Sequence, residues 1–150
     1  MAPVLAPFQW SLYAAKYPER AVPVINSLML SYTDLSLVND DVNKRIKPAP
    51  GVPDVLLGWV EDREPAGWCG DYAVTKRALL LRLGCSSAKL LLAHVLTATS
   101  ENHLVLVVDD QVLDNRVTVI RHRMKTGYKG VAIQTKDNPN FWEDASGMFH

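Results

Sequence analysis

The chain has 150 residues, 48% hydrophobic and 21% charged, which is typical of one globular domain spanning residues 1–150. Its 16 basic and 16 acidic residues cancel and form no long run of like charge, which argues against a nucleic-acid surface or a membrane-binding patch. The amino terminus lacks a basic segment, and Pro3 and Pro7 interrupt its apolar residues. We therefore expect a soluble, cytoplasmic protein without an export signal or a transmembrane segment.

Helical patterns dominate the first half of the chain. The stretch SLVNDDVNKRI places Leu37, Val38, Val42 and Ile46 at helical spacing, which predicts an amphipathic helix. The following KPAPGVP, residues 47–53, contains three prolines and a glycine and is predicted to be a loop. A short segment around VLLGWV and a polar break, EDREPAG, come next.

A second helix is predicted from Asp71 to Leu83. Its apolar residues surround most of the helix circumference, so we expect a buried central helix that ends at Gly84. Cys69 and Cys85 would lie at its opposite ends, too far apart to be bridged, and both are expected to be free thiols.

Strand patterns follow Gly84. KLLLAHVLTAT, HLVLVV, VLDNRVTVI and GVAIQT are rich in branched residues, and DDQ between the second and third predicts a tight turn. The sequence therefore predicts an α+β fold, in which a mainly helical N-terminal half packs on an antiparallel sheet of four or five strands.

Cys69 lies at the start of the predicted central helix, directly before Gly70 and two residues after Gly67. Unpaired N–H groups at a helix N-terminus carry partial positive charge and favour a thiolate. This position suits a nucleophile, although most free cysteines are simply small buried apolar residues.

Two later residues, His103 and Asp114, are candidate partners of a cysteine nucleophile. His103 opens the strand HLVLVV and would supply the base, and Asp114 would return beside it if residues 103–108 and 112–117 form a hairpin. The alternatives are a surface histidine at a strand end and a turn-forming Asp-Asn pair.

These three motifs, in this order and on these elements, resemble the bacterial transglutaminase-like cysteine peptidases. The resemblance covers roughly residues 38–142. The family reads Gly-Asp-Cys-Glu-Asp-Tyr-Ala around its nucleophile, followed by a Lys, where this chain reads GWCGDYA with Lys76. Matching positions are Gly67, Cys69, Asp71, Tyr72, Ala73 and Lys76, whereas Trp68 and Gly70 depart from the pattern.

The resemblance implies a papain-like, transglutaminase-type fold with Cys69 as nucleophile, His103 as base and Asp114 as the orienting carboxylate. It implies acyl transfer, with hydrolysis of a peptide bond in a protein or peptide substrate as the first expectation. Transamidation, action on another amide, and an inactive binding module remain open. The backbone N–H of Cys69 is expected to stabilise the oxyanion, and Gly67 and Trp68 are candidates for further oxyanion or substrate contacts.

A cofactor or metal is not expected. A periplasmic protease of the family that the chain resembles depends on calcium bound by the carboxylates on either side of its cysteine; here those positions are Trp68 and Gly70, so calcium dependence is doubtful. His94 is expected to be a hydrogen-bonded core residue, and Cys85 a packing residue. Trp59, Trp68 and Trp142 could wall a substrate cleft, but buried aromatics are ordinary core material, and only Trp68 is placed beside the chemistry.

Overall fold

The computed structural model describes residues 2–150. The helices are α1 (Phe8–Lys16), α2 (Tyr32–Arg45) and α3 (Cys69–Leu83), joined by short 3₁₀ turns η1 (Pro18–Arg20), η2 (Val55–Leu57), η3 (Ser87–Lys89) and η4 (Arg123–Lys125). The strands are β1 (Pro3–Val4), β2 (Leu91–Leu96), β3 (Asn102–Val108), β4 (Gln111–Leu113), β5 (Arg121–His122), β6 (Lys129–Gln134) and β7 (Trp142–Asp144).

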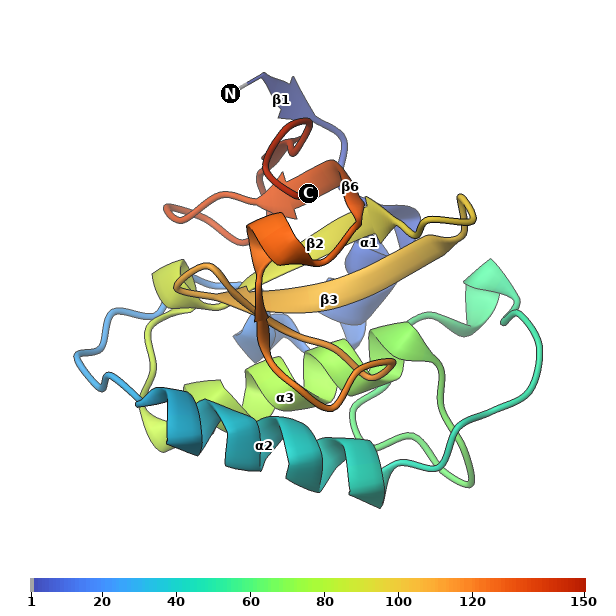
Figure 1. Cartoon of the computed structure of the whole chain (residues 1–150). Helices are drawn as coiled ribbons and strands as arrows, with labels where there is room; N and C mark the ends of the chain where they lie inside the picture. The colour runs from blue at the N-terminus through green and yellow to red at the C-terminus, as the bar shows by residue number, and fades with distance from the viewer. Residues whose placement is uncertain (1) are drawn as a thin grey trace.

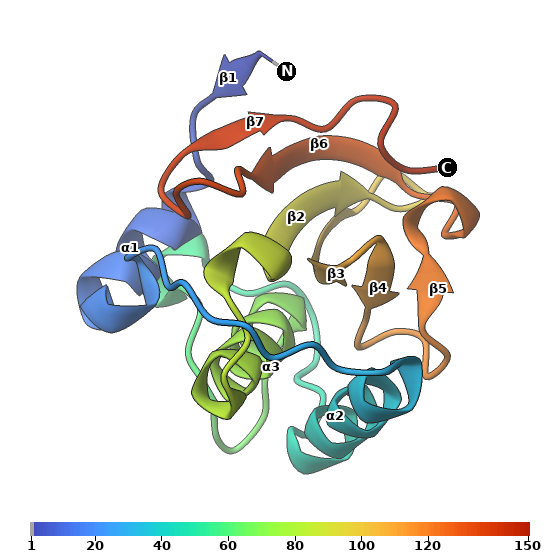
Figure 2. The same ribbon diagram turned by 90° about the vertical axis from the view of Figure 1, so that its left-hand side faces the viewer.

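The strands form one antiparallel sheet in the order β1-β7-β6-β2-β3-β4-β5, and the helices gather on one side of it (Figures 1 and 2). The α+β prediction is confirmed. The sheet has seven strands, more than the four or five expected. The additional strands were not predicted because β1, β5 and β7 are only two or three residues long and show no alternation of apolar and polar residues. Helix α1 was also not expected, since prolines surround it.

The predicted helices form for local reasons. Helix α2 begins earlier than its apolar pattern, at Tyr32, because Ser31 and Asp34 cap it reciprocally: the Ser31 hydroxyl accepts from the Asp34 N–H (3.1 Å), and the Asp34 carboxylate accepts from the Ser31 N–H (3.3 Å). Helix α3 is almost wholly buried, as predicted, and ends at Gly84, whose φ of 113° needs a residue without a Cβ.

Strands β2 and β3 are buried on both faces. Alternate residues such as Leu92 and Leu106 pack in the core between the sheet and α3, which also takes in the buried aromatics of α1. The residues between them, such as Val95 and Val105, pack in a second core that Phe149 helps to close. This burial on both faces holds α3 against the sheet, and among the strands α3 makes its most extensive contact with β3 (Figure 1).

The hairpin of β3 and β4 sets the position of the residues that follow it. It turns at Asp109 and Asp110, where the DDQ pattern predicted a tight turn, and both residues have a positive φ. Pairing runs from Val108 opposite Gln111 only as far as Leu106 opposite Leu113. The N-terminal half of β3 therefore has no β4 partner, and the chain after Leu113 is free to turn toward α3.

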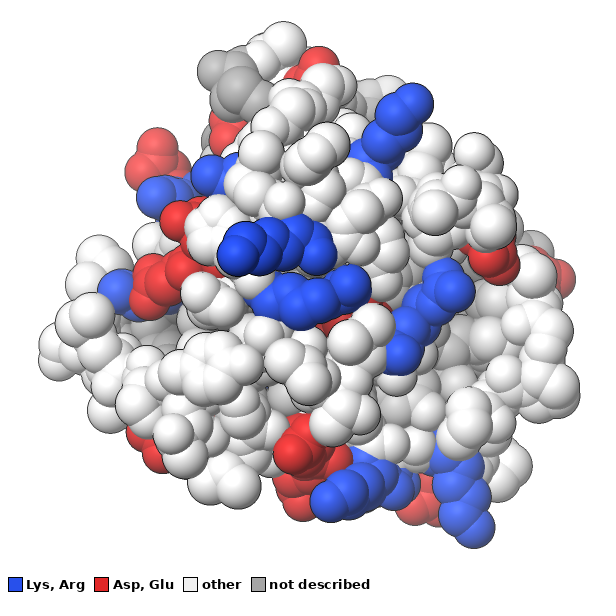
Figure 3. Space-filling view, viewed as in Figure 1, with Lys and Arg blue, Asp and Glu red and all other residues white. Residues whose placement is uncertain are grey.

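Charges of both signs cover the surface. Figure 3 shows Lys and Arg side chains gathered in the middle of one face, near η4, with Asp and Glu toward the edges of the view. Several of the basic groups have acidic partners, such as Arg123 with Asp110 (2.9 Å) and Lys89 with Asp109 (3.5 Å). That the protein binds no nucleic acid stays a prediction.

Among residues 2–150, no helix has the length and apolar character needed to cross a membrane.

Candidate active site

Cys69 is the first residue of α3, half-buried, at the point where a loop turns into the helix. The Asp71 carboxylate fixes this turn by accepting the N–H of Trp68 (2.9 Å). Within residues 2–150, no hydrogen-bond acceptor is paired with the backbone N–H of Cys69 or of Gly70. The thiol therefore lies where free helix N–H groups meet, as the sequence predicted.

His103 lies near the start of β3, with only 5% of its surface exposed. Its Nε2 is 2.8 Å from Oδ1 of Asp114, which directly follows β4. Cys69 lies near enough to the ring to favour its charged form. Since Nε2 is engaged by Asp114, Nδ1 is the ring nitrogen that remains for the thiol.

Asp114 is buried and held by several donors. The Tyr128 hydroxyl donates to its Oδ2, the Arg116 N–H donates to its Oδ1 (3.0 Å), and the Asn43 side chain donates to its carbonyl (2.9 Å). The ring of Tyr128 meets His103 edge-on, with centroids 5.5 Å apart. The imidazole is thus fixed from two sides.

The burial and pairing of His103 and Asp114 shift both of their pKa values. Burial acts to lower the pKa of His103, but the hydrogen bond and negative charge of Asp114, together with the nearby Cys69 side chain, raise it to about 9. Burial acts to raise the pKa of Asp114, but the hydrogen bond and charge of His103, with the donors above, lower it to about 2. At neutral pH the pair is therefore imidazolium and carboxylate.

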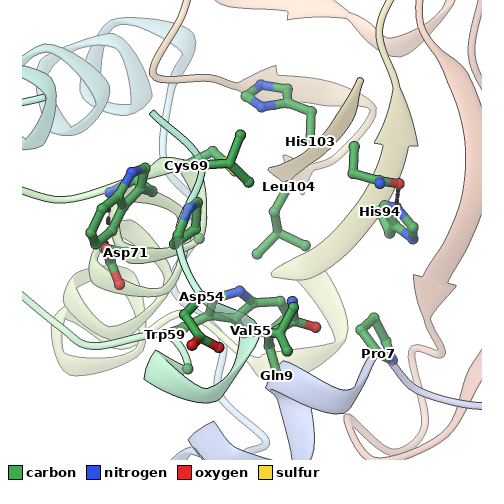
Figure 4. A pocket seen from close by; sticks show the side chains of 16 residues that line it. Pro7, Gln9, Asp54, Val55, Trp59, Cys69, Asp71, His94, His103 and Leu104 are labelled. Atoms are coloured by element: carbon green, nitrogen blue, oxygen red, sulfur yellow. Dashed lines mark hydrogen bonds between the residues drawn. The ribbon is translucent and has the colours of Figure 1, made fainter. Parts of the chain in front are cut away.

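Cys69 and His103 open onto a cavity of about 410 Å³ (Figure 4). Most of its lining is apolar, and it is formed by Pro7, Gln9, Val52, Pro53, Asp54, Val55, Gly58, Trp59, Trp68, Cys69, Gly70, Asp71, His94, Asn102, His103 and Leu104. The expectation that His94 is a core residue is wrong. It lines this cavity, half-buried, and its Nε2 lies 2.8 Å from Oδ1 of Asn102 (Figure 4).

The donors of Gly67 and Trp68 are already occupied, which counts against them as oxyanion donors. The Gly67 N–H bonds to the Lys47 carbonyl (2.8 Å), and the Trp68 N–H bonds to Asp71. The indole N–H of Trp68 points to the carbonyls of Pro50 and Gly51 (3.3 and 3.1 Å). Trp68 remains a wall of the cavity, and Gly67 anchors the preceding loop.

Two features of the site were missed from the sequence. Trp59, which could wall a cleft but was not expected beside the nucleophile, lies against Gly70, and the absence of a side chain at Gly70 was the signal that another group packs there. Tyr128 gave no signal, because nothing local to it in the sequence points to Asp114. Cys85 is a buried core residue, as expected, and burial raises the pKa of its thiol.

The sequence profile of the bacterial transglutaminase-like cysteine proteinases matches residues 3–148. The chain belongs to this family. It is accordingly a cysteine peptidase, and its fold is the transglutaminase-like one. No curated protein sequence matches it.

Solved structures of LapG from Legionella pneumophila share the fold of this peptidase. The calcium-bound form has a TM-score of 0.64 at 17% identity and covers 95% of this chain and 83% of its own. An EGTA-treated form has a TM-score of 0.60 at 18% identity and covers 83% of this chain and 71% of its own.

The residues around Cys69 do not fit a calcium ion. Both oxygens of Asp71 are engaged, Oδ1 by the Val60 N–H (2.8 Å) and Oδ2 by Trp68 N–H and Arg63 Nε (each 2.9 Å). No group of three or more His, Cys, Asp or Glu within residues 2–150 is arranged to hold a metal. Calcium prefers six to eight oxygen ligands, and here an arginine occupies the one carboxylate beside the nucleophile.

Proposed function

We propose that this peptidase hydrolyses peptide bonds with Cys69 as nucleophile, His103 as general base and acid, and Asp114 as the carboxylate that orients the imidazole. The observation that carries the proposal is the chain of contacts from Asp114 through the buried His103 to Cys69, which ends at an open cavity. A histidine fixed by a buried carboxylate and facing a thiol is the arrangement that activates a cysteine nucleophile.

The reaction proceeds in two halves. The Cys69 thiolate attacks the carbonyl carbon of the scissile amide, and a C–S bond forms as the carbonyl oxygen becomes an oxyanion. The protonated His103 gives its proton to the leaving nitrogen, the C–N bond breaks, and the amine departs. His103 then takes a proton from water as the water oxygen attacks the acyl carbon; the C–S bond breaks, the acid departs, and the thiolate is restored. Asp114 holds the ring throughout by its 2.8 Å contact.

The cavity favours an apolar segment of substrate. Val52, Val55, Trp59 and Leu104 line it, and Val52 is 94% exposed, so a large apolar side chain of the substrate would cover these residues. Transamidation requires an amine in place of water and remains the second candidate, because the same residues would perform it.

The test is cleavage of peptides derived from a proteome, with the new N-termini identified by mass spectrometry. Cys69→Ser and His103→Ala are expected to lower the rate by a factor of about 10²–10⁴. Cys85→Ser and His122→Ala, both outside the cavity, are the matched controls and should keep activity. Unchanged cleavage by Cys69→Ser would refute the proposal, and incorporation of a fluorescent amine into peptides, without cleavage, would establish transamidation in its place.

A further inference from the structure

Lys76 is a buried charged side chain that the reaction itself does not use. It lies on α3, seven residues after Cys69, and 0% of its surface is exposed. Complete burial of a lysine is uncommon, because an ammonium group loses its hydration and needs polar or charged neighbours in return. The groups around Lys76 therefore indicate what its charge does.

Lys76 points into the contact between α3 and α2, two helices that run side by side (Figures 1 and 2). This contact is apolar on either side of the lysine, where Tyr72 and Leu79 of α3 pack in one cluster with Val42 and Ile46 of α2. Lys76 is four residues after Tyr72 and three before Leu79, so it leaves α3 on the same face. Its ammonium lies 6.0 Å from the centre of the Tyr72 ring.

The facing side of α2 carries two asparagines, Asn39 and Asn43, one turn apart. Their amide N–H groups hold the segment after β4: Asn43 donates to the Asp114 carbonyl (2.9 Å), and Asn39 donates to the Thr118 carbonyl (3.2 Å). Their Oδ1 atoms are buried and, within residues 2–150, accept no hydrogen bond. An ammonium in the same interface is a donor of the kind that these two oxygens need.

The charged groups that face Lys76 are carboxylates. Burial lowers the pKa of Lys76 to about 7, while the negative charge of Asp114, followed by that of Asp40 on α2, acts to raise it. The attraction is mutual, so the ammonium favours the ionised form of Asp114. Arg121 of β5 also approaches this carboxylate, 3.7 Å from Oδ2. Tyr72 adds no charge near neutral pH, because burial raises the pKa of its hydroxyl.

We propose that Lys76 is a positioning residue for the reaction: its ammonium, set between the asparagines of α2 and Asp114, holds the segment after β4 and its ionised carboxylate in place beside His103. This inference rests on the proposed role of Asp114. Lys76 is not among the residues that line the cavity, and it acts through Asp114, whose Oδ1 is 2.8 Å from Nε2 of His103. Loss of the ammonium should therefore reduce turnover and leave substrate binding unchanged.

Lys76→Met removes the ammonium and keeps the length of the side chain. We expect kcat for peptide cleavage to fall by about 10- to 100-fold, because the imidazole is held less well in its reactive orientation. KM should stay within about twofold of wild type. The matched control is Lys44→Met, which removes an exposed lysine of α2 and should keep both constants.

A second measurement needs no activity. In protein labelled with ¹³C-lysine, NMR follows the titration of Lys76, whose resonance is the one missing from Lys76→Met or, if that variant does not fold, from Lys76→Arg. Asp114→Asn should lower the Lys76 midpoint from about 7 by about 0.5–1 unit, because the nearest negative charge is gone. Asp41→Asn removes an exposed carboxylate of α2 that pairs with Arg45, and should leave the midpoint unchanged.

A kcat of folded Lys76→Met within twofold of Lys44→Met would overturn the inference, and so would a Lys76 midpoint that Asp114→Asn leaves unchanged. Neither result would touch the role of Cys69, since Cys69→Ser tests that role separately. Cleavage that survives Cys69→Ser would refute the proposed function, whereas the coupled titration of Lys76 and Asp114 would still be measurable.

Discussion

Replacing Asp114 with Asn should return the buried imidazole toward its ordinary titration. The pKa of His103 is raised from 6.5 to about 9, which corresponds to an energy on the order of 3 kcal/mol in favour of the charged ring. Burial acts against this rise, and the hydrogen bond and charge of Asp114 contribute to it. We therefore expect Asp114→Asn to lower the pKa of His103 by about 1–3 units.

NMR titration of the histidine ring signals measures this change, with His103→Ala identifying the resonance among the four histidines. A raised pKa stabilises the folded state below pH 6.5 and ceases to do so as the pH rises through 9. The stability difference between wild type and Asp114→Asn should therefore be largest between about pH 4 and 6.5, shrink as the pH rises from 6.5 to 9, and be smallest above 9.

Asp110→Asn removes a carboxylate from the same hairpin and serves as the control, because Asp110 is exposed and pairs with Arg123. It should leave the His103 titration unchanged. The reasoning fails if wild-type His103 titrates at or below 6.5, or if Asp114→Asn leaves its midpoint where it was.

Three further predictions follow from the start of α3. Below pH 7, iodoacetamide should modify Cys69 more than about tenfold faster than the buried Cys85, and equal rates by mass spectrometry would contradict the nucleophile assignment. Gly70→Ala should displace the Trp59 ring, lowering stability by about 1–3 kcal/mol and activity with it; an unchanged melting temperature and rate would show that the contact is not tight. Millimolar calcium or a chelator should change neither activity nor melting temperature, and a clear rise with calcium would reveal a site built from other carboxylates.

Local pattern was enough to predict the helix that carries Cys69 and the strand that carries His103, whereas the strand expected over residues 112–117 was wrong beyond Leu113, so that Asp114 follows β4 instead of lying in it. The apolar run after Gly70 specified a buried helix, and the DDQ turn specified the hairpin that brings Asp114 back. Strands β1 and β7 were not predictable, because each is short. They pair with each other across about 140 residues of sequence, and β7 also pairs with β6.

The two tryptophans show why the walls of the site were harder to predict than its centre. Trp68 adjoins Cys69 in sequence, yet its indole turns to the loop carbonyls of Pro50 and Gly51. Trp59 is ten residues upstream and reaches Gly70 because the chain between them is pinned to Asp71 and Arg63. That path depends on tertiary contacts, which no periodicity encodes.

The β3–β4 hairpin has a consequence for how the site assembles during folding. His103 and Asp114 are 11 residues apart and belong to one hairpin, a local unit of the kind that forms within microseconds. Cys69 joins them only when α3 docks on the sheet, which closes a loop of 34 residues. We therefore expect the base to be assembled before the nucleophile, and fast alkylation of Cys69 at low pH during refolding to report the moment at which helix and sheet meet.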